Sequence, residues 1–227
     1  MSGQFEGFSD DTLRFLRDLA AHNDKAWFEA HRADYETAFV TLALDFVRSM
    51  APELQRLSKT ICCEPRINGS VFRINRDVRF SKDKTPYKPH IDFTFWDGGP
   101  RGFSTPSMFL RIAPSQVVVG AGVHDFGAAA PAYRAAVDDS RRGPALAKVL
   151  VSVPGAYSAS EPELKRVPRG FAAEHPRADL LKRKGLTVTL EQRPPDELGS
   201  AAFVAWCIGH YRALLPLHRW MLRTLSN

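Results

Sequence analysis

The central part of the chain, residues 71–121, alternates apolar and polar residues in short segments separated by links that contain proline or glycine. Alternation with a period of two is typical of β-strands that bury one face. Short links between consecutive strands favour antiparallel pairing. We therefore expect an antiparallel sheet whose strands lie at residues 71–80, 88–96, 107–113 and 116–121.

Two helical patterns precede this sheet. Residues 9–11, a serine and two aspartates, are a typical helix start, because serine caps the first turn and acids favour its dipole. That helix should end near residues 22–23. A second, longer helix should begin at residue 23 or 24, since its core-facing positions recur in steps of three and four: Phe28, His31, Tyr35, Phe39, Leu42, Phe46 and Met50. Pro52 should end this helix or open a short third one.

The part after residue 125 is mostly helical in pattern. We expect helices at residues 131–139, 144–150 and 178–184, and one further strand at residues 186–191. A C-terminal helix should begin after Ser200 and be broken or kinked at Pro216. Its apolar face would contain Phe203, Cys207, Tyr211 and Leu214.

Together these patterns predict a single α+β domain over residues 1–227. It would be helical over 1–60, form the sheet over 61–125 and be mixed helical over 126–227. The antiparallel sheet of four to five strands would pack against the long N-terminal helix and the C-terminal helix. A chain of 227 residues, 44% hydrophobic and 25% charged, can bury such a core without disulfides.

The cysteine content and the chain start favour a cytoplasmic protein. An odd number of cysteines, with two of them adjacent, is a poor disulfide framework and lacks zinc-site spacing: Cys62, Cys63 and Cys207. The first residues have neither the basic start nor the apolar run of a secretory signal. No stretch reaches about 18 uncharged apolar residues, so we expect no membrane span.

Residues 72–88 concentrate positive charge. Six lysines and arginines against two aspartates give +4 over this stretch, whereas the whole chain has a net charge of +6. If residues 71–80 form a strand, one face is apolar and contains Phe72, Ile74, Val78 and Phe80. Arg76 would fall among them, so we expect it to pair with a buried acid or to turn outward at a bulge.

The same stretch carries a resemblance to a known family. Residues 76–88, Arg-Asp-Val-Arg-Phe-Ser-Lys-Asp-Lys-Thr-Pro-Tyr-Lys, resemble the signature of the domain of unknown function 2461. Phe5-x-x-Phe8-Ser9 with residues 23–28, and Pro168-Arg-Gly-Phe with His175-Pro176, resemble further parts of that family. The resemblance spans most of the chain and implies an α+β fold. It brings no catalytic residues to carry over.

The polar faces of strands 71–80 and 88–96 would merge if the two strands pair. Guanidinium groups bind phosphate or carboxylate through paired hydrogen bonds, lysines would ring the loop above them, and a tryptophan can stack on a base. The structural alternative is a salt-bridged sheet face covered by a helix. The candidate ligand-binding residues are Arg73, Asn75, Asp77, Arg79, Lys82, Lys84, Lys88, His90, Asp92, Trp96 and, if the register allows, Arg111.

A metal site is the weaker hypothesis for this face. Asp77, His90 and Asp92 offer oxygen and nitrogen ligands, but Arg73 and Arg79 beside them would oppose a cation. We therefore expect no metal and no cofactor, and the common nucleotide-binding and hydrolase motifs are absent. Residues 165–184 form a second basic segment, of charge +5, which we interpret as scattered surface charge.

The sequence therefore favours a protein that binds a phosphate-bearing ligand, a nucleotide or a nucleic acid, through residues 73–88. The alternative is a non-catalytic interaction protein that docks an acidic partner protein through the same stretch. Catalysis and the oligomeric state stay open at this point.

Overall fold

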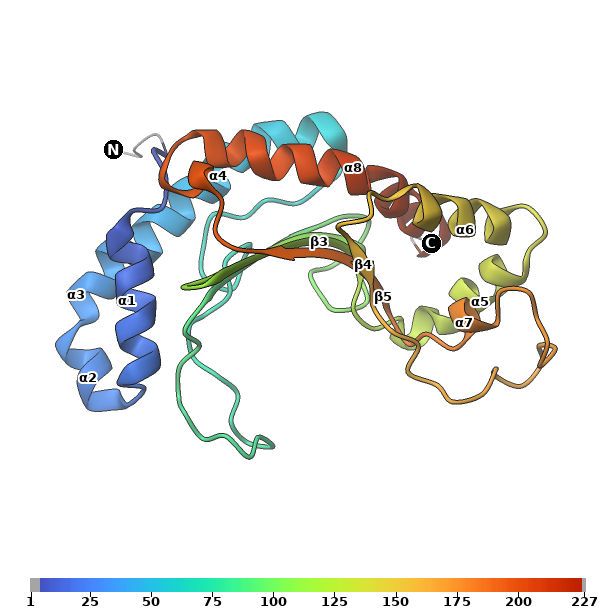
Figure 1. The fold of residues 1–227 in the computed structure, drawn as a ribbon, viewed down its shortest axis with the longest axis horizontal. Helices are drawn as coiled ribbons and strands as arrows, with labels where there is room; N and C mark the ends of the chain where they lie inside the picture. Colours follow the sequence, from blue (N-terminus) through green and yellow to red (C-terminus); the bar gives the residue numbers. More distant parts are fainter. Residues whose placement is uncertain (1–4, 226–227) are drawn as a thin grey trace. The chain divides into compact units, whose positions relative to one another are not determined.

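The computed structural model describes residues 5–225 and contains one antiparallel sheet of five strands (Figure 1). Its strand order is β1-β2-β3-β5-β4. The α+β prediction is confirmed, and the predicted bounds of the strand at 107–113 are those observed. The strands are β1 (Ile91–Trp96), β2 (Ser107–Ala113), β3 (Gln116–Val123), β4 (Ser158–Ala159) and β5 (Leu186–Gln192).

Helices precede and follow the sheet as predicted. The α-helices are α1 (Asp10–Ala21), α2 (Lys25–Ala30), α3 (Arg32–Asp34), α4 (Leu42–Leu57), α5 (Ala130–Asp138), α6 (Arg142–Ser152), α7 (Ala178–Leu181) and α8 (Ala202–Leu225). A π-helical segment, η1 (Tyr35–Thr41), and two 3₁₀ turns, η2 (Gly127–Ala129) and η3 (Asp196–Gly199), complete the set. Within residues 5–225, no helix combines the length and the hydrophobicity that crossing a membrane requires.

Contacts within the chain define two compact units. Unit 1 comprises residues 1–95, 109–118 and 191–209, and unit 2 comprises residues 96–108, 119–190 and 210–227. Each unit is described by itself below. The single domain expected over residues 1–227 stays a prediction.

An aromatic cluster forms the core of unit 1. Phe46 of α4 contacts Phe93 of β1 with ring centroids 5.0 Å apart, and Phe203 of α8 at 5.6 Å. Phe5 and Phe8 close the cluster from the N-terminal segment. All five rings are buried, so these residues attach α4 and the start of α8 to the sheet through apolar contact.

The prediction of one long second helix is wrong, because the structure divides this region into α2, α3, η1 and α4. Asp24 caps it as expected, accepting a hydrogen bond from the Trp27 N–H, but α2 ends before His31 and a π-helical segment follows α3. In the π-helical segment, the Ala38 carbonyl accepts a hydrogen bond from the buried Thr12 hydroxyl of α1, at 2.7 Å. This tertiary contact lies in a helix segment whose regular hydrogen bonding is interrupted, which sequence spacing does not reveal.

The expected strand at residues 71–80 is also wrong. Only isolated bridges occur there: Val71 pairs with Phe93 and Asn75 with Tyr87. Three residues separate Val71 from Asn75, but five separate their partners Tyr87 and Phe93. The segment at residues 88–92 therefore bulges between the two bridges. Pro89 lies in this bulge and has no N–H to donate, which explains why a regular ladder does not form.

Beyond Asn75 the chain leaves the sheet altogether. Val78 is half-buried and Phe80 is exposed, although the alternating pattern placed both on the core face. Ile74 is therefore the last apolar side chain of this alternating pattern that is buried, and the pattern does not predict burial beyond it.

Helices α4 and α8 each continue through an internal proline. Pro52 does not end α4, and Pro216 does not break α8, contrary to the expected helix end and break, while the alternative of a kink at Pro216 stays a prediction. Proline removes one backbone hydrogen bond, to the carbonyl four residues earlier. Both rings lie on exposed positions, so water can solvate the freed carbonyls of Arg48 and Arg212.

In unit 1, the side chain of Asn23 holds the backbone of Tyr87, near the end of the basic stretch. The Asn23 amide donates to the Tyr87 carbonyl and accepts from the Tyr87 N–H, both at 3.0 Å. The Tyr87 ring stacks on Phe28 at 4.2 Å. Because Tyr87 is buried, these two hydrogen bonds satisfy backbone groups that water would not reach.

Replacing Asn23 with alanine should therefore lower the free energy of unfolding by about 2–3 kcal/mol, because two buried backbone groups lose their partners. Urea denaturation measures the change. The matched control is Asn75→Ala, an exposed amide for which we expect less than about 0.5 kcal/mol. Equal effects in the two variants would show that the Asn23 contact is not stabilising.

Candidate functional site

The arginines of the basic segment, defined as residues 73–88, are mostly paired within the segment itself. Arg79 forms two hydrogen bonds to the Asp77 carboxylate, at 2.9 and 2.7 Å. Arg76 pairs with Asp83 and Thr85, and because Asp83 is an exposed acid, the expected pairing with a buried acid is wrong. The Lys84 ammonium donates to the Val78 carbonyl at 2.9 Å.

These pairings keep both acids of the segment ionised. The hydrogen bond from the Arg79 side chain is the main cause that lowers the pKa of Asp77 to about 2. Hydrogen bonds from the Thr85 backbone and then from Arg76 lower the pKa of Asp83 to about 2. The carboxylates thus neutralise two of the guanidinium groups that the sequence offered as anion ligands.

A second set of predicted residues meets at the Asp92 carboxylate. Arg111 of β2 donates to it at 2.7 and 3.3 Å, and the His90 ring nitrogen lies 3.2 Å away. The Lys88 ammonium lies 3.9 Å from the same carboxylate. The register thus brings Lys88, His90, Asp92 and Arg111 together. In this arrangement, the Asp92 carboxylate pairs with the basic side chains around it.

The remaining predicted residues do not join this set. Arg73, Asn75 and Lys82 are exposed. Trp96 belongs to unit 2 and is only 4% exposed, so its ring is not available for stacking on a base. No group of three histidine, cysteine or acidic side chains within residues 5–225 is arranged to hold a metal ion, and Asp77, His90 and Asp92 are no exception.

The second basic segment, residues 165–184, is partly structural. Arg177 donates to the Val137 and Asp138 carbonyls at 2.7 and 3.1 Å, and Lys182 pairs with Asp179. Arg183 is buried. Three of the seven basic side chains of this segment thus have structural surroundings, and the interpretation of the segment as scattered charge stays a prediction.

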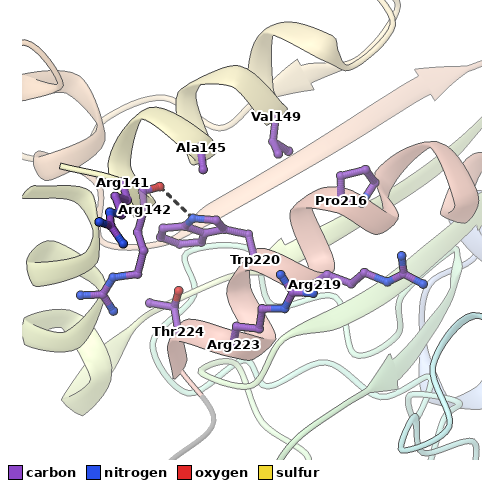
Figure 2. A pocket seen from close by; sticks show the side chains of 9 residues that line it. All are labelled: Arg141, Arg142, Ala145, Val149, Pro216, Arg219, Trp220, Arg223 and Thr224. Atoms are coloured by element: carbon purple, nitrogen blue, oxygen red, sulfur yellow. Dashed lines mark hydrogen bonds between the residues drawn. The ribbon is translucent and has the colours of Figure 1, made fainter. Parts of the chain in front are cut away.

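Unit 2 contains a pocket that sequence reasoning missed. We call it the arginine pocket. Its volume is about 480 Å³, and Figure 2 shows it between α6 and the C-terminal part of α8. The residues that line it are Arg141, Arg142, Ala145, Val149, Pro216, Arg219, Trp220, Arg223 and Thr224. The lining thus contains four arginines together with apolar residues.

Local contacts position α6 against α8. The Trp220 indole N–H donates to the Arg142 carbonyl at 3.0 Å (Figure 2). The Asp139 carboxylate caps α6 by accepting from the Arg141 and Arg142 N–H groups, and these bonds lower its pKa. A Cβ atom on Gly143 would lie 2.1 Å from the Val137 carbonyl, so α6 requires glycine there to pack against the end of α5.

The electrostatics of the arginine pocket differ from those of the basic segment. Arg142 lies 3.7 Å from Asp139, but within residues 5–225 no ion pair is formed by Arg141, Arg219 or Arg223. The lining residues that the structure describes include no carboxylate, imidazole or thiol. All four arginines are exposed at the rim, whereas Trp220 is 9% exposed and forms part of the wall.

The signal for this pocket was present in the sequence. The residues that α8 contributes are spaced as one helical face: 216, 219, 220, 223 and 224. A break or kink at Pro216, as expected from the sequence, would end or redirect that face, whereas α8 continues to Leu225. The partner helix α6 is distant in sequence, so no local pattern connects Arg141 and Arg142 to α8.

Comparison with known protein families identifies a match to this chain. The model of the family described as conserved hypothetical protein (DUF2461) matches residues 11–220 of the 227-residue chain. The match confirms the resemblance seen in the sequence, and the description of the family names no ligand. No curated protein matches the chain.

The Asp92 carboxylate makes stability depend on pH. Burial alone would raise its pKa, but hydrogen bonds from His90 and Arg111 outweigh burial and lower the pKa to about 2. Since the folded-state pKa lies below the unfolded-state value near 3.9, the carboxylate contributes stability above about pH 4 that is lost as the pH falls towards 2.

We expect this contribution to be about 2 kcal/mol, and Asp92→Asn should lack the corresponding loss between about pH 5 and pH 2. Urea denaturation of both proteins over this range measures it. The control is Asp179→Asn, an exposed acid in a surface pair with Lys182. If wild type and Asp92→Asn lose stability in parallel on acidification, the Asp92–Arg111 pair does not stabilise the fold.

Proposed function

The chain belongs to the family described as conserved hypothetical protein (DUF2461), and from the geometry of its arginine pocket we propose that it binds a small phosphate-bearing ligand of the nucleotide class. The observation that carries the proposal is the presence of four arginines in the lining of one cavity, whose described lining residues include no acid. Like charges repel, so a fold gains nothing from gathering them unless an anion binds there.

Phosphate is the anion that suits this arrangement. The planar guanidinium group presents its N–H donors as a fork that binds two phosphate oxygens at once. Arg219 and Arg223 lie one turn apart on α8, while Arg141 and Arg142 approach from the start of α6. A phosphate group can therefore be contacted from both helices.

The apolar walls favour a ligand with an organic part over inorganic phosphate. Ala145, Val149 and Pro216 line the cavity together with the Trp220 ring. A volume of about 480 Å³ is large enough for a small organic molecule, because ligand sites usually occupy ~300–1,000 Å³. A nucleoside monophosphate combines a flat apolar base with a charged phosphate and matches both kinds of wall.

The proposal keeps the ligand class expected from the sequence and changes its place. In the basic segment, Arg76 and Arg79 are already paired with Asp83 and Asp77, so an incoming phosphate would compete with carboxylates. In the arginine pocket, such competition is limited to the long contact between Arg142 and Asp139. The cytoplasmic location expected from the cysteine content remains part of the proposal.

Replacing Arg219 and Arg223 together with alanine should weaken binding of nucleoside monophosphates by about tenfold or more for each guanidinium lost, because charge-assisted hydrogen bonds contribute ~1.5–3 kcal/mol each. Isothermal titration calorimetry with the four common nucleoside monophosphates measures the effect. Unfolding temperature should change little, since the two side chains are exposed.

The matched control is Arg212→Ala, which removes an exposed arginine of α8 that does not line the pocket. Titrations with adenosine and with inorganic phosphate separate the two parts of the ligand, and both should bind more weakly than the nucleotide. The proposal fails if no nucleotide binds the wild-type protein, or if Arg212→Ala weakens binding as much as the double variant does.

A further inference from the structure

The basic segment exposes an aromatic ring on a projecting loop. Phe80 is 95% exposed, in contrast to the buried phenylalanines of the unit 1 core. Figure 1 shows residues 73–88 as a long loop in teal that reaches away from the strand following it. A phenyl ring in water contributes nothing to the core, and its exposure makes the Phe80 ring available for contact with another molecule.

Neighbouring charges orient this ring. The Arg79 guanidinium lies over the Phe80 ring, 5.8 Å from its centroid, and two hydrogen bonds from Arg79 to Asp77 fix the guanidinium in turn. Asp77 and Arg79 therefore act as positioning residues. One face of the ring has the guanidinium above it, and the exposure of the side chain leaves the other face open to a ligand.

Two lysines supply positive charge beside the ring. Lys82 is exposed, and within the part of the chain that the structure describes it has no acidic partner. The Lys84 ammonium donates to the Val78 carbonyl, two residues before Phe80 in the sequence, and this neutral acceptor leaves the lysine charge unneutralised. The loop thus combines one stacking surface with cations on the same short stretch.

We propose that this loop binds single-stranded nucleic acid, with one base stacked on Phe80 and neighbouring phosphates contacted by Lys82 and Lys84. Proteins that bind single strands combine basic surfaces with aromatic side chains in this manner. One exposed ring suits one base, whereas a stable protein partner needs about 800 Å² of contact on each side, which a narrow loop does not offer. The site lies in unit 1 and does not depend on the arginine pocket of unit 2.

Fluorescence anisotropy with labelled 20-residue oligodeoxythymidylate and oligouridylate tests the proposal. Phe80→Ala should weaken binding about fivefold to a hundredfold, the range seen when a stacked aromatic is removed, and Phe80→Tyr should restore it. The matched control is Phe103→Ala, which removes a 67% exposed phenyl ring from a different loop and should leave binding unchanged.

The salt dependence supplies a second readout. Each phosphate contact contributes about −0.7 to the slope of log affinity against log salt for single strands. Lys82→Ala/Lys84→Ala should therefore make the slope less steep by about 1.4. The proposal is overturned if neither oligonucleotide binds, if Phe80→Ala matches Phe103→Ala, or if a polyglutamate peptide binds in a Phe80-dependent way and the oligonucleotides do not.

Discussion

The pairing of guanidinium groups with carboxylates is the interaction on which the arrangement of charge in this protein depends. Arginine stays charged at any ordinary pH, so each one needs a carboxylate, a carbonyl or water beside it. In the basic segment, Asp77 and Asp83 satisfy two arginines, and Asp92 satisfies Arg111. In the arginine pocket, Asp139 uses its carboxylate mainly to cap α6, and three of the four arginines have no described acid partner. This difference favours the arginines of the pocket over those of the basic segment as ligands of a nucleotide phosphate, while Lys82 and Lys84 of the basic segment keep their charge without an acid.

Helix α8 creates the pocket by continuing through Pro216. The residues after the proline keep the helical period, which places Arg219, Trp220 and Arg223 on one face. The Trp220 indole then binds the Arg142 carbonyl, so the tryptophan both fixes α6 and forms part of the pocket wall. A single side chain thereby connects the packing of unit 2 to the shape of its cavity. Because Pro216 is exposed, water can solvate the carbonyl that loses its helical hydrogen bond, so α8 continues with little loss of stability.

Much of the fold follows from local patterns. The strand at 107–113 and the helix starts at Ser9 and Asp24 were predicted, since alternation and helix-start signals depend on neighbouring residues. The Asp24 carboxylate caps its helix, whereas the expected side-chain cap by Ser9 is not formed. The segment at 71–80 was mispredicted, because the bulge at Pro89 on its partner interrupts the ladder and Phe80 leaves the sheet.

The candidate sites show the same limit. Local charge indicated residues 73–88, but not which acids would neutralise them. Contacts such as Arg111 with Asp92 and Trp220 with Arg142 join residues 19 and 78 positions apart, and no local pattern encodes them. The arginine pocket could be found only after α6 and α8 were placed together, although the helical spacing of residues 216–224 was already visible.

The most direct measurement is a crystal structure of the protein grown with a saturating nucleoside monophosphate. The account predicts phosphate density within hydrogen-bond distance of at least two of the four arginines, with the base against Trp220 and Val149. A nucleotide bound elsewhere, or an arginine pocket that stays empty while nucleotide is present in excess, would contradict it.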